Sequence, residues 1–373
     1  MRTTLLRSPL ARRSSLLESK TSYATPDTHT WVTILAGGIG SRFWPASTPE
    51  RPKQLLRLGT NEPLIVDTMR RAGALVPTER IRILAGENLR SPIKSVLPDL
   101  ERDNFWIEPQ ARGTAPVLAW AAAKLARLDP EAVMVSLHAD HLLDPIEEFV
   151  ETVASAVEVA RRDDLLLTIG VSPDRIETGY GHIESGEQLK AAGLAKSFRV
   201  NGFHEKPDEE TARGYVDQGY LWNTGIFIWK ARVLLEELSR HAPEISDLLP
   251  VIDNEGADAF FERVPVSVID RAIMERSDRV GVVEATFKWD DVGSWQALSR
   301  TQALDELGNV SLGNVELVDS RGSIVYQEGP GQVVLMGTED LVVVQVKDTT
   351  MVMPRARASQ LKEFLSRIEG ATK

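Results

Sequence analysis

The segment ILAGGIGSRFWPASTPERPKQ combines glycines and cations in an arrangement suited to binding a polyphosphate. It begins as an apolar run typical of a buried strand, and Gly37, Gly38 and Gly40 follow at once. Glycine permits positive φ and close backbone approach, so successive N–H groups can converge on an anion. Arg42 adds a guanidinium fork and Lys53 a compact ammonium, and both suit phosphate oxygens.

This glycine segment fits neither of two common phosphate-binding patterns. The dinucleotide pattern G-x-G-x-x-G accommodates Gly38 and Gly40, but its third position is Phe43. The P-loop pattern requires Gly-Lys followed by Ser or Thr, and the sequence has no such tripeptide. The alternative to an anion site is a tight strand-to-helix turn with solvated charges. The spacing of arginine and lysine around a loop stiffened by prolines favours the anion site.

Two acidic positions offer ligands for a hard divalent cation. Asp140 follows the apolar run AVMVSL, so it lies at the carboxyl end of an expected strand. Asp290 and Asp291 precede a glycine and an expected helix start. Mg²⁺ prefers oxygen ligands and usually keeps several waters, so one or two carboxylates together with phosphates suffice. For Asp290 we favour a different interpretation, as a solvated neighbour or a helix cap.

These residues depend on a framework in which strands and helices alternate. The runs WVTILA, IRILAG, NFWIEP, AVMVSLHAD and DLLLTIGV indicate strands, and LIVDTMRRAGAL, TAPVLAWAAAKLARL and PIEEFVETVASAVEVARR indicate helices. Such alternation predicts an α/β fold, with a mostly parallel sheet flanked by helices. Ligands of such sheets bind beyond the carboxyl ends of the strands, so the loops after Ala36, Ile107 and Leu137 should share one edge.

The sequence changes character near its C-terminal end. Residues 306–373 are rich in valine and broken by Asp-Ser, Arg-Gly and Gly-Pro pairs, which is typical of short strands and turns. We expect a main α/β domain over residues 31–305 and a small β-rich C-terminal domain with a terminal helix over residues 306–373. The spacing i, i+3, i+4, i+7 places the apolar residues of that helix on one face: Leu361, Phe364, Leu365 and Ile368.

Composition narrows the class of protein. The chain has 373 residues, of which 42% are hydrophobic and 26% charged, and it has no cysteine, which excludes disulfides, thiolate zinc sites and cysteine nucleophiles. A net charge of −11 argues against nucleic-acid binding. No apolar run approaches the ~18 residues of a membrane span. We therefore expect a cytoplasmic protein with no nucleic-acid or membrane partner.

The first 30 residues differ from the rest of the chain. MRTTLLRSPLARRSSLL carries four arginines and no acidic residue, a composition that resembles a transit peptide. The alternatives, which we favour, are a disordered tail or a spurious extension from an upstream start codon.

Taken in order, the motifs resemble those of the sugar-1-phosphate nucleotidyltransferases, and specifically the mannose-1-phosphate guanylyltransferases. They are LAGGIGSRFWPAS, PKQ, WIEPQARGTAP, HADH, TGYGHI, FHEKP, WNTGIF, IDRAIME and WDDVGSW, and the resemblance spans Trp31 to Met353. It implies a Rossmann-like (GT-A-like) catalytic domain that transfers GMP from GTP to α-D-mannose 1-phosphate. Mg²⁺ would assist an in-line attack without a covalent intermediate. A homodimer is compatible with this interpretation.

The resemblance also implies roles for individual residues. Arg42 and Lys53 would be catalytic, and Asp140 and Asp291 would hold the metal. The nucleotide-binding residues would be Ala36, Gly37, Gly38, Gly40, Glu108, Arg112 and Thr114. The sugar-phosphate-binding residues would be Tyr180, Gly181, Glu205, Lys206, Asn223 and Thr224.

Three points stay open at the level of sequence. Glu108 could accept hydrogen bonds from guanine N1–H and N2–H₂, or it could be a structural cap. The chain departs from the family pattern at Gly113, where the family has asparagine, and at His138, where it usually has proline. Two alternative functions remain: the same chemistry with another hexose-1-phosphate or nucleotide, and a non-catalytic sugar-nucleotide-binding regulatory homologue. Retention of the two cations and two aspartates counts against the second.

Overall fold

A computed structural model describes residues 28–38 and 40–368; residues 1–27, where the transit peptide or tail is expected, lie outside the described residues. The core of the main domain is a nine-stranded sheet with the order β3-β2-β1-β4-β9-β6-β10-β8-β7. All of its strands except β8 and β9 run in one direction, which confirms the mostly parallel α/β sheet. The strands are β1 Thr30–Leu35, β2 Ile81–Ala85, β3 Phe105–Ile107, β4 Val133–His138, β6 Leu166–Val171, β7 Gly181–Gln188, β8 Ser197–Glu205, β9 Leu221–Lys230 and β10 Val280–Glu284.

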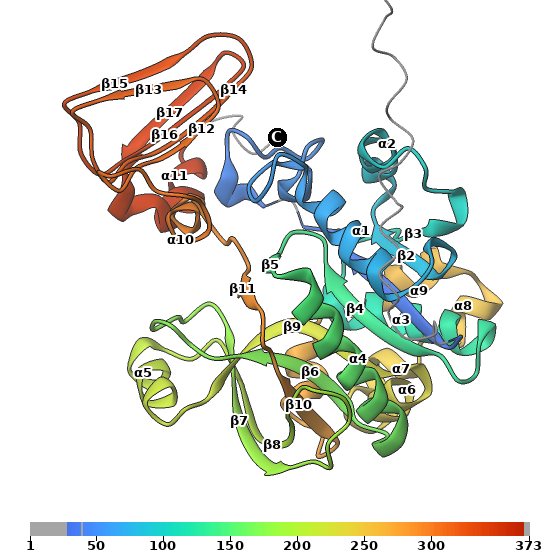
Figure 1. The fold of residues 1–373 in the computed structure, drawn as a ribbon. Coiled ribbons are helices and arrows are strands. Elements are labelled where there is room, and N and C mark those ends of the chain that lie inside the picture. The colour runs from blue at the N-terminus through green and yellow to red at the C-terminus, as the bar shows by residue number, and fades with distance from the viewer. Residues whose placement is uncertain (1–27, 39, 369–373) are drawn as a thin grey trace, which may run out of the picture.

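Helices cover both faces of this sheet (Figure 1). The period-2 alternation of β1 explains why, since Val32 and Ile34 pack on one core while Trp31 and Leu35 pack on the other. The first core includes α1, α2 and α4, and the second includes α3, α6 and α9. The helices are α1 Leu64–Leu75, α2 Glu87–Val96, α3 Thr114–Leu128, α4 Ile146–Asp163, α5 Glu209–Asp217, α6 Ala231–His241, α7 Pro243–Ser246, α8 Val251–Asn254, α9 Ala257–Arg263 and α10 Leu298–Thr301. None of the described helices is both long and apolar enough to cross a membrane.

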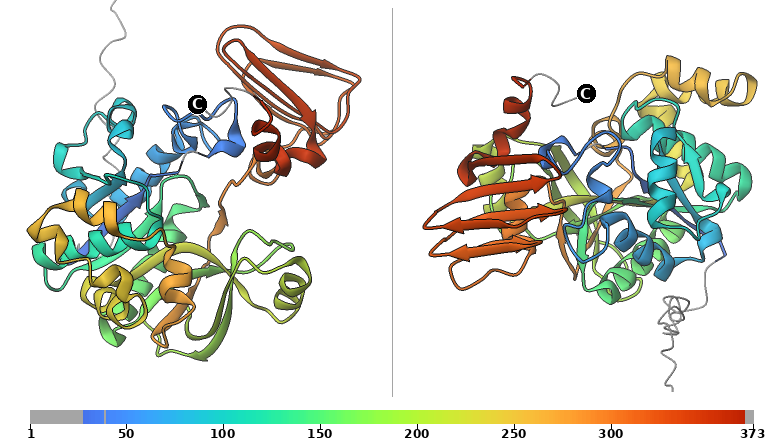
Figure 2. Two further views of the ribbon diagram at one scale, coloured as in Figure 1. Left: turned by 180° about the vertical axis from the view of Figure 1, so that it is seen from behind. Right: turned by 90° about the horizontal axis from the view of Figure 1, so that it is seen from above.

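The C-terminal segment forms a separate stack of short strands (Figure 2). Its strands pair in parallel as β12–β14–β16 and β13–β15, which places Val325 beside Val343 and Val315 beside Val333. The expected terminal helix is shorter than predicted: α11 covers only Leu361–Leu365, and Ile368 lies beyond it with 49% of its surface exposed. The strands are β12 Val310–Leu312, β13 Val315–Val318, β14 Ile324–Glu328, β15 Val333–Met336, β16 Leu341–Val346 and β17 Thr349–Pro354.

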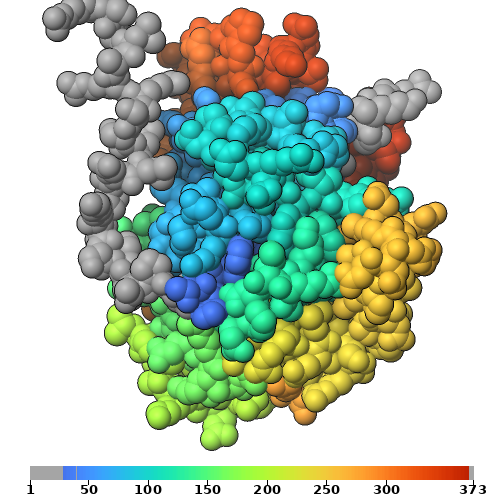
Figure 3. Space-filling view, turned by 90° about the vertical axis from the view of Figure 1, so that its right-hand side faces the viewer, coloured from blue at the N-terminus to red at the C-terminus, as the bar shows by residue number. Residues whose placement is uncertain are grey.

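The segment after the glycine loop packs against this C-terminal stack. Phe43 and Leu56 share one buried cluster with Trp295 and Tyr326, and Arg51 pairs with Glu328 at 2.8 Å. Figure 3 shows the orange-red C-terminal unit adjoining the blue N-terminal segments. A two-stranded ribbon, β5 Leu142–Asp144 with β11 Lys288–Asp290, brings the second acidic motif next to the loop after β4. These contacts hold the glycine segment in one place over the carboxyl ends of β1, β3 and β4.

Candidate active site

The glycine loop leaves β1 and passes directly over Lys53. The backbone N–H of Ala36 donates to the Leu84 carbonyl at 2.9 Å, and its carbonyl accepts from the Gln54 amide at 2.7 Å. Gly40 has a φ of 70°, and a Cβ placed on it would lie 2.3 Å from the Cβ of Lys53. Only glycine therefore allows the loop to pass this close to the lysine.

The buried side chain of Lys53 joins the two predicted metal ligands. Its Nζ lies 2.9 Å from Asp140 Oδ2 and also donates to the backbone carbonyl of Asp291. The Tyr180 hydroxyl donates to Asp291 Oδ1 at 2.6 Å. Burial alone would raise the pKa of Asp140, but the charge of Lys53, its hydrogen bond and the two neighbouring histidines together outweigh burial and hold that pKa well below the usual range. Four predicted site residues thus form one connected network.

Arg42 lies at the open side of this network. Its side chain is exposed, and none of the residues that the structure describes forms a hydrogen bond or ion pair with its guanidinium. A Cβ placed on Gly293 would lie 3.5 Å from Arg42 Nη1 and 3.0 Å from Asp291 Oδ2, so both groups face the same small space. An unpaired guanidinium in this position is available to an incoming phosphate.

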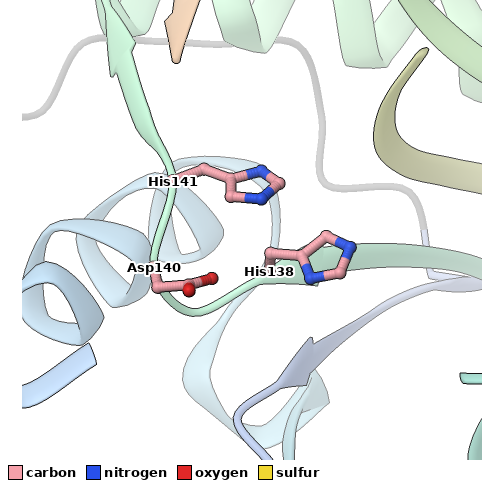
Figure 4. A group of neighbouring side chains, drawn as sticks. All are labelled: His138, Asp140 and His141. Atoms are coloured by element: carbon pink, nitrogen blue, oxygen red, sulfur yellow. The ribbon is translucent and has the colours of Figure 1, made fainter. Parts of the chain in front are cut away.

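Asp140 lies on the loop that follows β4, beside His138 and His141 (Figure 4). The ligand atoms of His138, Asp140 and His141 all lie within 4.8 Å of one another. The two rings stack with centroids 4.5 Å apart, and the Trp289 indole N–H donates to His141 Nδ1 at 3.1 Å. The carboxylate oxygens of Asp140, with those of Asp291, suit a hard dication such as Mg²⁺.

A cleft of about 390 Å³ opens between the glycine loop and the end of β3. This volume falls within the ~300–1,000 Å³ typical of small-molecule sites. Its walls are Gly37 and Gly38, residues 86–89 and residues 107–111. Among them Glu108 is buried, which raises its pKa to about 6 although the backbone N–H of Arg112 donates to it.

The start of α2 is absent from the sequence-based set of site residues. Gly86, Glu87 and Asn88 follow β2 directly and line the cleft. Because β2 is the parallel neighbour of β1, its carboxyl end lies at the same edge of the sheet. The run IRILAGEN, an apolar strand ending in glycine, carries the signal that could have identified them.

Arg112 and Thr114 contact distant parts of the chain. Arg112 Nε donates to the Phe261 carbonyl at 2.7 Å, and its Nη2 donates to Gln110 Oε1 at 2.8 Å. Thr114 Oγ1 accepts from the backbone N–H of Ile269 at 2.9 Å. These bonds fix the loop that leads into α3, and a direct role of either side chain in nucleotide binding stays a prediction.

The predicted sugar-phosphate residues gather where β7 begins and β8 ends. Gly181 and Glu205 are cross-strand partners, and a Cβ placed on Gly181 would lie 3.0 Å from Glu205 Oε2. Lys206 pairs with Glu205 and has a φ of 52°. Tyr180, which contacts Asp291, directly precedes Gly181. The charged pair and the Asp291 carboxylate are therefore linked through one short segment.

Asn223 and Thr224 differ in what their side chains can offer a ligand. Asn223 Oδ1 accepts from the Thr168 hydroxyl at 2.7 Å, and its Nδ2 donates to Asp270 Oδ1 at 2.9 Å. The Thr224 hydroxyl donates to the Ile169 carbonyl at 2.8 Å and is turned into the sheet. Sugar binding by these two side chains stays a prediction.

Asp270 is a second residue absent from the sequence-based set. It lies at the start of a short π-helical segment, Asp270–Met274, and holds the amide of Asn223. Burial and the nearby Glu205 raise its pKa to about 7. The motif IDRAIME contains it, but an aspartate in a short mixed segment of charged and apolar residues gives no indication of where its side chain points.

Asp290 is not the solvated neighbour that the sequence led us to expect. It is 7% exposed. Its Oδ1 accepts from the backbone N–H of Val292 at 2.7 Å, its Oδ2 accepts from Arg300 Nη2 at 2.9 Å, and Arg175 Nη2 lies 3.8 Å away. Val292 has a φ of 47°, so Asp290 anchors a left-handed turn that positions Asp291.

Comparison with known families gives two matches along the chain. Residues 32–307 match the family described as nucleotidyl transferase, and residues 313–368 match the MannoseP isomerase/GMP-like beta-helix domain. Among curated relatives, the alginate biosynthesis protein AlgA of Pseudomonas aeruginosa is 35% identical over 355 residues, 90% of this chain and 71% of that protein. The mannose-1-phosphate guanylyltransferase of Escherichia coli is 36% identical over 350 residues, 90% of this chain and 73% of that protein.

Solved structures resemble the fold. A protein from Thermus thermophilus, described as a mannose-1-phosphate geranyltransferase, has a TM-score of 0.84 at 31% identity and covers 92% of this chain and 100% of its own. A Helicobacter pylori protein described as a mannose-6-phosphate isomerase has a TM-score of 0.57 at 23% identity, over 70% of this chain and 99% of its own, and shows likeness of fold alone.

Proposed function

Because this chain belongs to the nucleotidyl transferase family, we propose that it transfers GMP from GTP to α-D-mannose 1-phosphate. A phosphate oxygen of the sugar phosphate attacks the α-phosphorus of GTP in line with the bond to the β-phosphate. That bond breaks, pyrophosphate leaves with its electron pair, and GDP-mannose forms. No protein nucleophile is required, so the protein contributes position and charge.

The observation that carries this proposal is the placement of Lys53. Its ammonium contacts Asp140 and Asp291. The glycine loop passes over it at Gly40, where only a residue without a Cβ fits. Arg42 stands on the open side of the same space. In our proposal Lys53 and Arg42 bind the triphosphate. Donors held in fixed positions stabilise the charge that develops in the transition state.

Asp140 and Asp291 would hold a divalent cation, which we expect to be Mg²⁺. When bound, the cation would neutralise phosphate charge and polarise phosphoryl oxygens. The Tyr180 hydroxyl fixes one oxygen of Asp291, and the turn anchored by Asp290 orients its backbone. Glu205 and Lys206 would bind the sugar hydroxyls and sugar phosphate, respectively. We propose residues 31–305 as the catalytic domain and 306–373 as a separate β-rich domain, in a protein of the cytoplasm.

In our proposal Glu108, which lines the cleft, determines the selectivity for guanine. Ionised Glu108 accepts two hydrogen bonds from guanine, and its pKa of about 6 places protonation just below neutral pH. We expect the KM for GTP to rise as the pH falls through about 6, because protonation removes one acceptor. Substrate phosphates also titrate near pH ~6. The test is therefore the difference between wild type and Glu108→Gln, and identical pH profiles of the two would contradict the assignment.

Substitutions of the adjacent residues Asp290 and Asp291 should have different effects, one on the stability of the fold and the other on metal binding. Asp291→Asn should raise the Mg²⁺ concentration needed for half-maximal activity and leave the Tm nearly unchanged. Asp290→Asn should leave the metal requirement unchanged and destabilise the fold by about 1–3 kcal/mol, since Arg300 and Arg175 lose the charge of their buried partner. Mg²⁺ titrations and thermal unfolding of both variants measure this. A weakened metal requirement in Asp290→Asn alone would mean that Asp290 is the ligand.

Pyrophosphate release measured across a matrix of substrates tests the function itself. GTP, ATP, UTP and dTTP are each offered with mannose 1-phosphate and with glucose 1-phosphate. We expect the highest kcat/KM for GTP with mannose 1-phosphate. Preference for another pair would establish the same chemistry with other substrates. Binding of GDP-mannose without Mg²⁺-dependent turnover would instead establish a regulatory sugar-nucleotide-binding protein.

A further inference from the structure

His138 lies beside the proposed metal ligand Asp140, and the proposed function gives its imidazole no role. The residue ends β4, and the family pattern usually has proline there. Among the described residues, none forms a hydrogen bond with either of its ring nitrogens. The ring is nevertheless held in place, because it stacks on His141 and a Cβ placed on Gly225 would lie 2.8 Å from its Nε2.

Asp140 has one carboxylate oxygen available next to this ring. Lys53 contacts Oδ2 at 2.9 Å, and none of the described donors contacts Oδ1. The Asp140 side chain is 30% exposed, so solvent and ions can reach it. The carboxylate of Asp140 and the imidazole of His138 each offer one ligand atom, and these two atoms lie within 4.8 Å of each other.

His141 belongs to the same cluster but is not equivalent to His138. Its Nδ1 accepts the indole N–H of Trp289 at 3.1 Å. A neutral imidazole has one acceptor nitrogen and one N–H, so Nε2 of His141 then carries the proton and has no lone pair for a metal. The nitrogen ligand of this site is therefore His138.

We propose that His138 and Asp140 together make this site bind first-row transition-metal dications, such as Co²⁺ and Mn²⁺, more tightly than Mg²⁺. The inference rests on the proposed function for the presence of a dication at Asp140. Carboxylate, carbonyl and water ligands alone suit Mg²⁺, whereas an imidazole ligand shifts preference toward first-row transition metals. Proline at position 138 would supply no ligand, so this selectivity belongs to this chain rather than to the family pattern.

Mn²⁺ bound to the full-length protein in the presence of GTP, without sugar phosphate, provides a direct test. Electron spin-echo modulation from a directly bonded ¹⁴N reports an imidazole ligand. We expect this signal in the wild type and in His141→Asn, whose amide oxygen can still accept from Trp289, but not in His138→Ala. Competition titrations should show the ratio of Mn²⁺ to Mg²⁺ affinity falling at least about tenfold in His138→Ala, the lower end of losses seen for outer-shell partners.

The outcomes separate this inference from the proposed function, because neither measurement needs turnover. A wild-type protein without ¹⁴N modulation, or an affinity ratio unchanged in His138→Ala, would overturn the role of His138 whatever the enzyme's activity. Modulation that persists in His138→Ala and disappears in His141→Asn would assign the ligand to His141 and also overturn it. If His138→Ala does not fold, as judged by circular dichroism, His138→Asn gives the same readouts.

Discussion

Lys53→Ala is expected to lower kcat by about 100- to 1,000-fold, the range found when one preorganised transition-state donor is removed. Lys53 is 5% exposed, and its ammonium contacts both Asp140 and Asp291. Its removal leaves the charge of Asp140 without its closest counterion, at the point where we propose that the triphosphate binds. Steady-state kinetics at saturating GTP and mannose 1-phosphate give kcat, and thermal unfolding shows how much protein stays folded.

Lys288→Ala is the matched control for this substitution. Lys288 is an exposed lysine on β11, two residues before the acidic pair, so its removal changes the net charge close in sequence to the site. We expect a kcat close to that of the wild type. A folded Lys53→Ala protein with near-normal turnover would reject the catalytic assignment of Lys53, and an equal loss in both variants would indicate a general effect of charge.

The alternation of strands and helices was enough to predict which loops lie at the same edge of the sheet. The loops after Ala36, Ile107 and Leu137 do share an edge, because β1, β3 and β4 are parallel strands of one sheet. Local patterns suffice here, since each strand is a short apolar run and the crossover rules fix the direction in which it points. The resemblance of the motifs assigned Lys53, Asp140 and Asp291 to one site, and in the structure Lys53 contacts both aspartates.

The features that could not be predicted from the sequence depend on contacts between residues that are distant in the chain. Asp290 is buried in β11, where Arg300 pairs with its carboxylate and Arg175, from a segment about 115 residues earlier, lies 3.8 Å from it. Gly113 has a φ of 86°, and a Cβ placed on it would lie 2.2 Å from the Ser267 carbonyl, a constraint set about 150 residues away. Asp270 joins the site through Asn223 in the same way. No single-sequence pattern contains these distances.

Gly40→Ala is expected to lower kcat/KM by about 100-fold, the loss that a misplacement of roughly 1 Å can cause in a catalytic site. Left-handed backbone costs a non-glycine residue about 1–2 kcal/mol, and φ at Gly40 is 70°. In addition, the new Cβ would lie 2.3 Å from the Cβ of Lys53, which is the rigid stem of that side chain and not its flexible end. Either the loop or Lys53 must move, so kinetics and Tm should both change.

Gly38→Ala tests whether the added methyl group affects GTP binding without affecting the stability of the fold. Apart from its chain neighbours, none of the described residues has a heavy atom within 4 Å of a Cβ placed on Gly38, so the substitution should leave the Tm unchanged. If the triphosphate passes over this backbone, the same methyl group raises the KM for GTP while the KM for mannose 1-phosphate stays nearly constant. An unchanged KM for GTP would place the triphosphate elsewhere, and a wild-type kcat/KM in Gly40→Ala would show that the contact between loop and lysine is not required for the reaction.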